Sequence, residues 1–369
     1  MIRLLLAFVL AAAVLPAQGS RWTAEMAQAW YARQPWLVGA NFLPSTAGNQ
    51  LEMFQAATWD PKTIDRELGW AASLGMNTLR VYLHDLLWKQ DSAGFLKRLG
   101  EFLGICKKHG IRPVLVFFDS CWDPNPKPGP QRQPTPGVHN SVWVQSPGAA
   151  MLADDKAIPH LREYVIGTIG SFRSDERILA WDLWNEPDNT NDSSYGKIEL
   201  KNKKERVAKL LPMVFQWARS AKPAQPLTSG VWVGPDWSDN SKLSAIQRTQ
   251  LNESDIISFH NYENAQSFQK RLAELKKYNR PLLCTEYMAR GAGSTFEAIL
   301  PIAKQNKVAA INWGLVKGKS QTHIPWDSWQ QPYVNREPNP WHHDIFLPDG
   351  KPYRQPEVDF IRKMTGKAR

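Results

Sequence analysis

The chain has 369 residues, of which 43% are hydrophobic, enough to bury either one large α/β barrel or two ordinary domains. Its net charge of +10 includes a basic run at 197–209, but acidic residues are interspersed there and a helix follows. We therefore interpret the run as a solvated helix face and expect no nucleic-acid partner. The three cysteines, Cys106, Cys121 and Cys284, allow at most one disulfide and leave open which pair would form it.

Residues 1–19 have the pattern of a secretory signal peptide. Arg3 precedes an apolar stretch at 4–15, and small residues follow at Ala17 and Gly19. This stretch is too short to span a membrane, and no later stretch reaches about 18 apolar residues without a charge. We predict a secreted or periplasmic protein that has no membrane span in the mature chain and is a monomer.

The remaining chain alternates between predicted helices and strands. Thr23 is expected to cap a short helix that ends at Arg33, before the first strand. The expected strands are 36–42, 77–84, 111–118, 178–184, 226–232, 256–262, 281–287 and 308–315. The expected helices are 60–74, 95–109, 154–172, 201–221, 241–249, 264–278, 294–306 and 355–364.

Eight strands separated by helices are typical of a (β/α)8 barrel, also called a TIM barrel. We predict that residues 20–369 form a single barrel, with its core at about 36–320, a short N-terminal helix and long loops on the C-terminal face. The glycine-rich phosphate loops that are common in open α/β sheets do not occur in this sequence.

The proline-rich segment 123–148 is too long for a simple connector. It is either a linker between domains or a large loop beside a cleft, and we favour the loop because another helix and strand follow in the same rhythm. Trp122, His139, Asn140 and Trp143 are then expected to reach a ligand. Seventeen tryptophans also favour a sugar-binding cleft, because a pyranose stacks on an exposed indole ring.

Two glutamates follow apolar strands. The strand at 178–184 stops at Asn185-Glu186-Pro187, and proline biases the residue before it toward extended geometry, so we expect Glu186 to be extended at the strand end. Glu286 ends the seventh strand. In a closed barrel these carboxylates face each other, and such a pair cleaves an acetal when one is protonated and the other ionised. A glutamate that simply faces water is the alternative.

Further polar and aromatic residues lie at strand ends. Arg80 shares one side of the second strand with Tyr82 and His84, and an arginine in so apolar a strand needs a carboxylate partner. His260 and Tyr262 share one side of the sixth strand. The candidate substrate-binding residues are Arg80, Asn185, His260, Tyr262, Trp313, Trp122, Asp119, His84, Asn41 and Trp232. No metal or cofactor is expected, since the adjacent His342 and His343 diverge and no His-Glu-x-x-His motif occurs.

The motifs Asn-Glu-Pro at strand four, His-x-Tyr at strand six, Thr-Glu-Tyr at strand seven and Trp at strand eight resemble those of the clan A retaining glycoside hydrolases, especially family 5 and its cellulase-like relatives. The resemblance covers about 36–313. The resemblance implies that Glu186 is the acid/base and Glu286 the nucleophile, and that Arg80 keeps the nucleophile ionised. It also implies that Asn185 binds the sugar 2-hydroxyl and that Trp313 is the platform under the sugar. His260 and Tyr262 are the residues implied to orient the carboxylates.

Electrostatics agree with these implied roles. Arg80 should lower the pKa of Glu286, whereas burial among Trp184, His260 and Tyr262 should keep Glu186 protonated. The pattern departs from the family at strand three, where members usually carry a histidine and this chain has Asp119 and Trp122.

We expect a retaining β-glycosidase that hydrolyses a polysaccharide or oligosaccharide of the β-glucan, mannan or xylan type. The alternative is a barrel that binds carbohydrate without turnover or acts as a transglycosylase. The sugar, the linkage and the choice between endo and exo action stay open, although the long loop at 123–148 favours a pocket over an open cleft.

Overall fold

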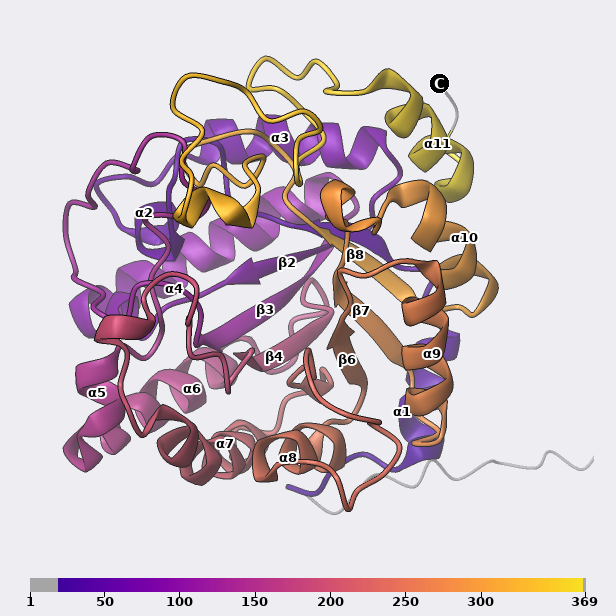
Figure 1. The fold of residues 1–369 in the computed structure, drawn as a ribbon. Helices are drawn as coiled ribbons and strands as arrows, with labels where there is room; N and C mark the ends of the chain where they lie inside the picture. The colour runs from indigo at the N-terminus through magenta and orange to yellow at the C-terminus, as the bar shows by residue number, and fades with distance from the viewer. Residues whose placement is uncertain (1–18, 368–369) are drawn as a thin grey trace, which may run out of the picture.

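The computed structural model describes residues 19–367. Within them, eight parallel strands form one sheet, and helices surround it in a ring (Figure 1). The predicted (β/α)8 barrel is confirmed, while the predicted signal peptide, apart from Gly19, lies outside the described residues. The strands are β1 Val38–Asn41, β2 Thr78–Tyr82, β3 Arg112–Asp119, β4 Ala180–Asn185, β5 Leu227–Thr228, β6 Ile257–His260, β7 Leu282–Glu286 and β8 Ala309–Trp313.

The helices alternate with these strands. They are α1 Ala24–Ala32, α2 Gln50–Phe54, α3 Pro61–Ser73, α4 Asp85–Lys108, α5 Ala149–Ala153, α6 Ile158–Phe172, α7 Lys203–Ser220, α8 Ala245–Glu253, α9 Ala265–Lys276, α10 Phe296–Gln305 and α11 Gln355–Thr365. Short 3₁₀ turns occur at Asp155–Ala157, Gly196–Ile198, Arg290–Ala292 and Trp326–Trp329. None of the helices within residues 19–367 combines the length and apolar character needed to cross a membrane.

Each strand pairs with its neighbours in the order β5-β4-β3-β2-β1-β8-β7-β6. The remaining gap, between β5 and β6, is bridged by Val231. Its N–H donates to the carbonyl of Ser258 (3.2 Å), and its own carbonyl accepts from the N–H of His260 (2.9 Å). β5 has only two residues, Leu227 and Thr228, instead of the predicted 226–232. Because β5 is too short to pair with β6, the single bridge at Val231 closes the barrel.

The barrel opening at the amino ends of the strands is covered by α1. Thr23 caps this helix by accepting a hydrogen bond from the N–H of Met26 (3.2 Å), as predicted. Trp30 and Tyr31 on α1 pack in one buried apolar cluster with strand residues such as Ile311. Substrate access is therefore left to the opposite face, where the carboxyl ends of the strands lie.

Four helical segments differ from prediction, among them α5, which was not predicted, and α8, which begins at Ala245 instead of residue 241. Residues 50–54 form α2 rather than a polar loop, because the Asn49 side chain caps it by accepting from the N–H of Glu52. α4 begins at Asp85 instead of residue 95 and is kinked at Asp91, which has φ −165° and ψ 78°. The kink interrupts the apolar periodicity, which explains why the first turns of α4 were not predicted.

The segment 120–148 contains no helix or strand, and it returns to the strand that it leaves. Ser146 and Asp119, the last residue of β3, exchange two backbone hydrogen bonds of 2.6 and 3.0 Å. The segment is therefore a loop on the carboxyl face of one barrel, as predicted, and not a linker between domains.

Candidate active site

Glu186 and Glu286 lie at the carboxyl ends of β4 and β7. Glu286 is the last residue of β7, and Glu186 directly follows β4. One carboxylate oxygen of each glutamate and one ring nitrogen of His260 all lie within 4.8 Å of one another. All three side chains are buried. The closed ring of strands therefore brings together two carboxyl groups that lie far apart in the sequence.

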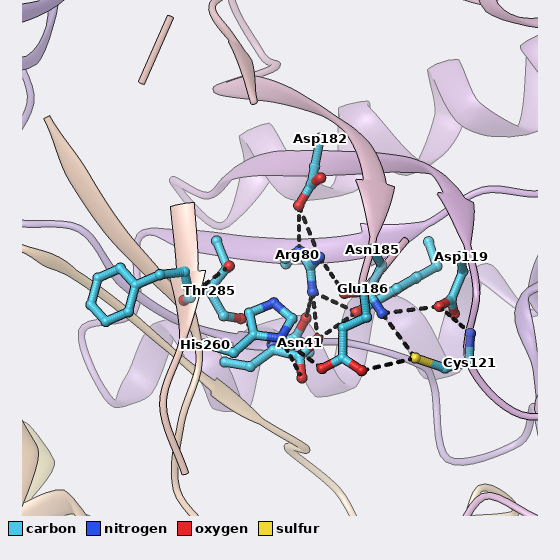
Figure 2. Close-up of polar contacts among 12 residues, drawn as sticks. Asn41, Arg80, Asp119, Cys121, Asp182, Asn185, Glu186, His260 and Thr285 are labelled. Atoms are coloured by element: carbon cyan, nitrogen blue, oxygen red, sulfur yellow. Dashed lines mark hydrogen bonds and ion pairs between the residues drawn. The ribbon is translucent and has the colours of Figure 1, made fainter. Parts of the chain in front are cut away.

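The backbone of Glu186 is not extended, contrary to the prediction from Pro187. Its φ is +41°, in the left-handed region, and the N–H of Asn189 donates to its carbonyl oxygen (2.9 Å) in a tight turn. A non-glycine residue in this region costs about 1–3 kcal/mol and persists only where its surroundings hold it. Here the turn directs the Glu186 carboxylate toward His260, as Figure 2 shows.

Glu286 is surrounded by strong donors. Its Oε1 accepts hydrogen bonds from Nη1 of Arg80 (2.7 Å) and from the hydroxyl of Tyr82 (2.8 Å). Its Oε2 accepts from the hydroxyl of Tyr262 (2.8 Å). These contacts hold both carboxylate oxygens in place and favour the ionised form of Glu286.

Arg80 is fully buried and connects four strands (Figure 2). Its guanidinium donates to Oδ2 of Asp182 (2.9 Å), to Oδ1 of Asn185 (2.8 Å) and to Oδ1 of Asn41 (3.1 Å), besides Glu286. The carboxylate partner predicted for Arg80 is thus provided twice. Asn41 lies behind the guanidinium, where its amide also donates to backbone carbonyls, so it orients Arg80.

Within residues 19–367, no cationic side chain is in hydrogen-bond contact with Glu186. Its Oε2 accepts from Nδ2 of Asn189 (2.7 Å) and lies 3.2 Å from the thiol sulfur of Cys121. Its Oε1 lies 2.9 Å from Nδ1 of His260. Neutral donors stabilise a carboxylate less than a guanidinium does, so the burial of Glu186 is poorly compensated.

The pKa values of both glutamates follow from these surroundings. Burial raises the pKa of Glu186 to about 7, against the opposing effect of hydrogen bonds from Asn189 and Cys121. Burial also raises the pKa of Glu286, while His260 and Arg80 oppose the rise. Arg80 thus lowers the pKa of Glu286, as predicted, but the desolvation of this enclosed carboxylate outweighs that effect, and the net shift is upward.

His260, on β6, lies between the two glutamates. Its Nδ1 is 2.9 Å from Oε1 of Glu186 and 3.5 Å from Oε2 of Glu286. Burial lowers the pKa of His260 to about 4, so the ring is neutral near pH 7. According to its tautomer, a neutral imidazole at this position accepts a hydrogen bond from protonated Glu186 or donates one to its carboxylate.

Asn185 is held at both ends of its amide. Its Oδ1 accepts from Arg80, and its Nδ2 donates to Oδ1 of Asp119 (2.9 Å). Asp119 also accepts from the indole of Trp143 (2.7 Å) and from the backbone N–H of Cys121 (2.9 Å). Asp119 is fully buried, and burial raises its pKa. It therefore acts on the site through Asn185 and the loop after β3.

A cavity of about 540 Å³ opens above the glutamates. Among the residues that the sequence singled out, Trp122, Trp232 and Trp313 line it, together with Asn185, Glu186, Tyr262 and Glu286. Trp313 forms the base of an aromatic cluster, with its ring 5.8 Å from Tyr82 and 5.7 Å from Trp143. The volume and aromatic lining are suited to a sugar ring.

Two predicted positions are wrong. His84 does not share the side of Arg80, because β2 ends at Tyr82; the His84 ring instead caps α4 by accepting from the N–H of Leu86 (3.1 Å). Trp184 does not border Glu186. Its ring contacts Phe118 and donates to Oγ of Ser120 (2.9 Å), away from the cavity.

Four residues of the site were missed as site residues. Cys121 and Asn189 contact Glu186 from irregular turns, for which the sequence shows no pattern. Tyr82 and Asp182 do show a sequence pattern. Tyr82 lies two residues after Arg80 on β2, and Asp182, on β4, lies four residues before Glu186 and faces Arg80. Period two had already placed Tyr82 beside Arg80, without naming it a site residue, and the same rule applied to β4 would have included Asp182.

Glu186, His260 and Glu286 together offer three possible metal ligands. The guanidinium of Arg80, however, lies 2.7 Å from Glu286 and opposes the approach of a second cation. The donor set is thus better suited to a pair of carboxyl groups, one of them beside a cation, than to holding a metal.

A (β/α)8 barrel with paired glutamates after its fourth and seventh strands is the arrangement of the clan A glycoside hydrolases. Residues 45–332 match the family Cellulase (glycosyl hydrolase family 5). The chain therefore belongs to glycosyl hydrolase family 5. The comparison with curated proteins gave no match.

Similar solved structures share the fold at low sequence identity. They include an exo-β-1,4-mannosidase from an Opitutaceae bacterium (19% identity, TM-score 0.58, 90% of this chain and 60% of that one) and a GH5_18 protein from Bifidobacterium longum in complex with Manβ1-4GlcNAc (15%, 0.59, 90% and 78%). A third is an endo-1,4-β-D-mannanase from Thermotoga petrophila (14%, 0.56, 89% and 99%). The chain spans only 60% of the length of the Opitutaceae mannosidase.

Proposed function

We propose that this protein is a retaining β-glycosidase that acts by double displacement. The observation that carries the proposal is the spacing of the two glutamates, which have carboxylate oxygens within 4.8 Å of each other. Retaining glycosidases have carboxyl groups about 5–5.5 Å apart, whereas inverting enzymes leave about 6.5–9.5 Å for a water molecule. The short spacing favours direct attack by a carboxylate.

The different environments of the two glutamates support a different role for each. Glu286 is held by Arg80, Tyr82 and Tyr262, which leaves an ionised carboxylate in fixed position to attack the anomeric carbon. Glu186, with a pKa raised to about 7, is protonated below neutral pH and donates that proton to the departing oxygen. The ionised Glu186 then takes a proton from the water that hydrolyses the glycosyl-enzyme.

Asn185 and Trp313 are proposed to hold the sugar during these steps. Asn185 has one amide proton that is directed to Asp119 and a second near Cys121 at 3.5 Å, a weak contact that a sugar hydroxyl would replace. Trp313 lines the cavity floor, where its ring can stack under a pyranose.

The substrate is proposed to be a β-linked oligosaccharide or polysaccharide of the glucan, mannan or xylan type. β-Mannosides are the first candidates, because the names of several similar structures refer to mannanases and a mannosidase.

The test is the anomeric configuration of the first product. Wild-type protein is incubated with aryl β-mannoside, β-glucoside and β-xyloside, and early products are followed by proton NMR, with Glu286→Ala as the inactive control. We expect the β-anomer to form first. Initial release of the α-anomer would refute double displacement. If the wild type hydrolysed no aryl glycoside but still bound oligosaccharide, the result would refute the enzyme and favour a barrel that binds carbohydrate without turnover.

A further inference from the structure

One side of the cavity is closed by the loops after β3 and β8, which are joined by hydrogen bonds. The N–H of His139 donates to Oγ of Ser328 (3.0 Å), the ring Nδ1 of His139 bonds to the carbonyl of Ile324 (2.7 Å), and the N–H of Asn140 donates to the carbonyl of Ser320 (2.9 Å). All five residues are buried. The two loops thus form a continuous wall, defined here as residues 137–141 with 320–328.

The loop after β4 contacts the outer end of this wall. The amide of Gln330 donates to the carbonyl of Ser193 (2.8 Å), and the ring of Tyr195 meets that of Trp329 edge to face at 4.9 Å. Trp329 in turn stacks on Trp122, with 5.6 Å between ring centroids and 15° between planes. Trp122, which lines the cavity from the loop after β3, is therefore supported by Trp329.

Behind Trp313, on the side of β1 and β2, almost no space remains. Leu43, Tyr82, Trp143 and Val316 surround a void of only about 20 Å³. A void of this size holds about one water molecule, so it cannot accept a second sugar. The catalytic cavity therefore ends at Trp313 and the wall.

The side of the cavity toward β4 and β5 is open. Its exposed lining residues are Asp192, Ser193 and Lys204, which follow β4, and Val233, which follows β5; Trp326, also exposed, is the outer edge of the wall. Asp188 and Trp232 also lie there, joined by an indole hydrogen bond of 2.7 Å, and they follow the strand ends next to Glu186. A leaving group protonated by Glu186 has room on this side.

Asn140 is the unusual residue of the wall. It is fully buried and lines the cavity, yet neither its Nδ2 nor its Oδ1 has a hydrogen-bond partner among residues 19–367. A buried amide without partners is costly, and a ligand hydroxyl would satisfy both atoms. Beside it, His139 bonds the Ile324 carbonyl through Nδ1, which leaves Nε2 as an acceptor in the cavity lining.

We propose that the site accepts only the terminal sugar at the non-reducing end of a β-linked chain, and that Asn140 binds a hydroxyl of that sugar. The inference rests on the proposed function. The sugar bound covalently by Glu286 lies over Trp313 on the closed side, so nothing can be attached beyond it. The rest of the chain leaves with the group protonated by Glu186, on the open side. The enzyme is therefore exo-acting.

The cleavage mode is tested with mannohexaose and cellohexaose labelled at the reducing end with 2-aminobenzamide. We expect the label to appear first on the pentasaccharide, together with free monosaccharide, and a non-reducing end blocked by a 4,6-benzylidene group to lower the rate at least 100-fold. Release of disaccharides or longer unlabelled products would overturn the inference. Hydrolysis of no oligosaccharide and no aryl β-glycoside would instead refute the proposed function itself.

The role of Asn140 is tested with Asn140→Gly, because its φ of 46° suits glycine and would strain alanine. The matched control is Asn279→Gly, which alters an exposed asparagine with φ 52° at the end of α9, away from the cavity. On the preferred aryl β-glycoside, Asn140→Gly should lower kcat/KM about 10- to 100-fold, and the control should not change it.

Deoxy substrates separate hydrogen bonding from mere support of the loop. Wild type should discriminate against one of the 3-, 4- and 6-deoxy analogues of that glycoside by about 10- to 100-fold, and Asn140→Gly should lose this discrimination. If the variant discriminated against every analogue as strongly as wild type, Asn140 would not be a ligand of the sugar.

Discussion

The two glutamates are equally buried but lie in different electrostatic surroundings. Glu286 accepts from a guanidinium and two phenolic hydroxyls, and through Arg80 it belongs to a network that includes a second carboxylate, Asp182. Glu186 contacts an amide, a thiol and a neutral imidazole. The surroundings of Glu286 stabilise a negative charge, whereas those of Glu186 leave its carboxyl group easier to protonate.

This difference shows that burial alone does not assign roles to paired carboxylates. Burial raises the pKa of both groups, and the nature of the donors separates them. The cationic and phenolic donors to Glu286 come from β2 and from the turn after β6, while the neutral partners of Glu186 come from the turns after β3 and β4 and from His260 on β6. The predictions below change one side at a time.

The largest effect is expected from the carboxylates themselves. Glu286→Ala should lower kcat/KM by about 10⁴-fold or more on every β-glycoside, because the nucleophile takes part in both chemical steps. Glu186→Ala should cost about 10²- to 10⁴-fold on substrates with poor leaving groups and far less on dinitrophenyl glycosides, which leave without a proton. A leaving-group series measured for both variants tests this contrast, and equal dependence in both would contradict it.

Arg80→Met removes the charge that links the two buried carboxylates. Asp182 and Glu286 then lack their cationic partner, and breaking such a buried pair costs about 3–5 kcal/mol in the free energy of unfolding. Urea titration at pH 7 measures this. Asp182→Asn in the Arg80→Met background should recover part of the loss, because it removes one unpaired charge. Unchanged stability in the single variant would show that the network does not hold the fold.

Glu186→Gln should change how stability depends on pH. The pKa of Glu186 is about 7 in the folded chain and about 4.5 in its ordinary state, so its contribution to stability is present below pH 4.5 and lost as pH rises to 7. The loss is on the order of 2–3 kcal/mol. Unfolding at a series of pH values should show that Glu186→Gln declines less than wild type over this range.

The control for that experiment is Glu163→Gln, an exposed residue of α6. Buried Glu67, whose pKa burial also raises to about 7, contributes equally to all three proteins and cancels in the difference. Parallel stability curves for wild type and Glu186→Gln would mean that Glu186 is ionised at little cost, and the assigned acid would lose its physical basis.

The smallest effect is expected at Cys121. Cys121→Ala removes one donor to the Glu186 carboxylate, which should raise its pKa, move the alkaline limb of kcat/KM upward by less than about one pH unit and lower activity roughly tenfold. Cys121→Ser keeps a donor and should restore most of both. Cys106→Ala, a buried cysteine on α4, should leave the limb in place. If neither Cys121 variant shifted the alkaline limb of kcat/KM, the thiol would have no part in the pH dependence of activity.

Much of the architecture could be predicted, because local patterns encode it. Alternating apolar strands and helices indicate the barrel, Pro187 and Tyr287 follow the two glutamates at strand ends, and period two correctly places Arg80 and Tyr82 on one side. The same rule failed one step later at His84, because the strand ends at Tyr82 and the backbone turns into α4.

The contacts that residues in irregular turns make were beyond sequence analysis, although Asn140 was correctly expected to reach the cavity. Proline biases the residue before it toward extended geometry, yet Glu186 has a positive φ that the surrounding contacts impose. Asn189 reaches the Glu186 carboxylate only because of the tight turn that this φ allows. Cys121 and Asn140 belong to a loop whose path depends on hydrogen bonds to segments 60 to 190 residues away in the chain. No local pattern predicts such partners.

The sequence by itself determined the eight strands, the carboxylates that follow two of them and the arginine that needed an anionic partner, because strand period and the cost of burying a charge act over a few residues. Only the tertiary structure decided that burial outweighs Arg80 at Glu286, that neutral donors surround Glu186 and that the cavity ends at Trp313. Desolvation and closure depend on atoms from distant parts of the chain, and these come together only when the ring of strands closes.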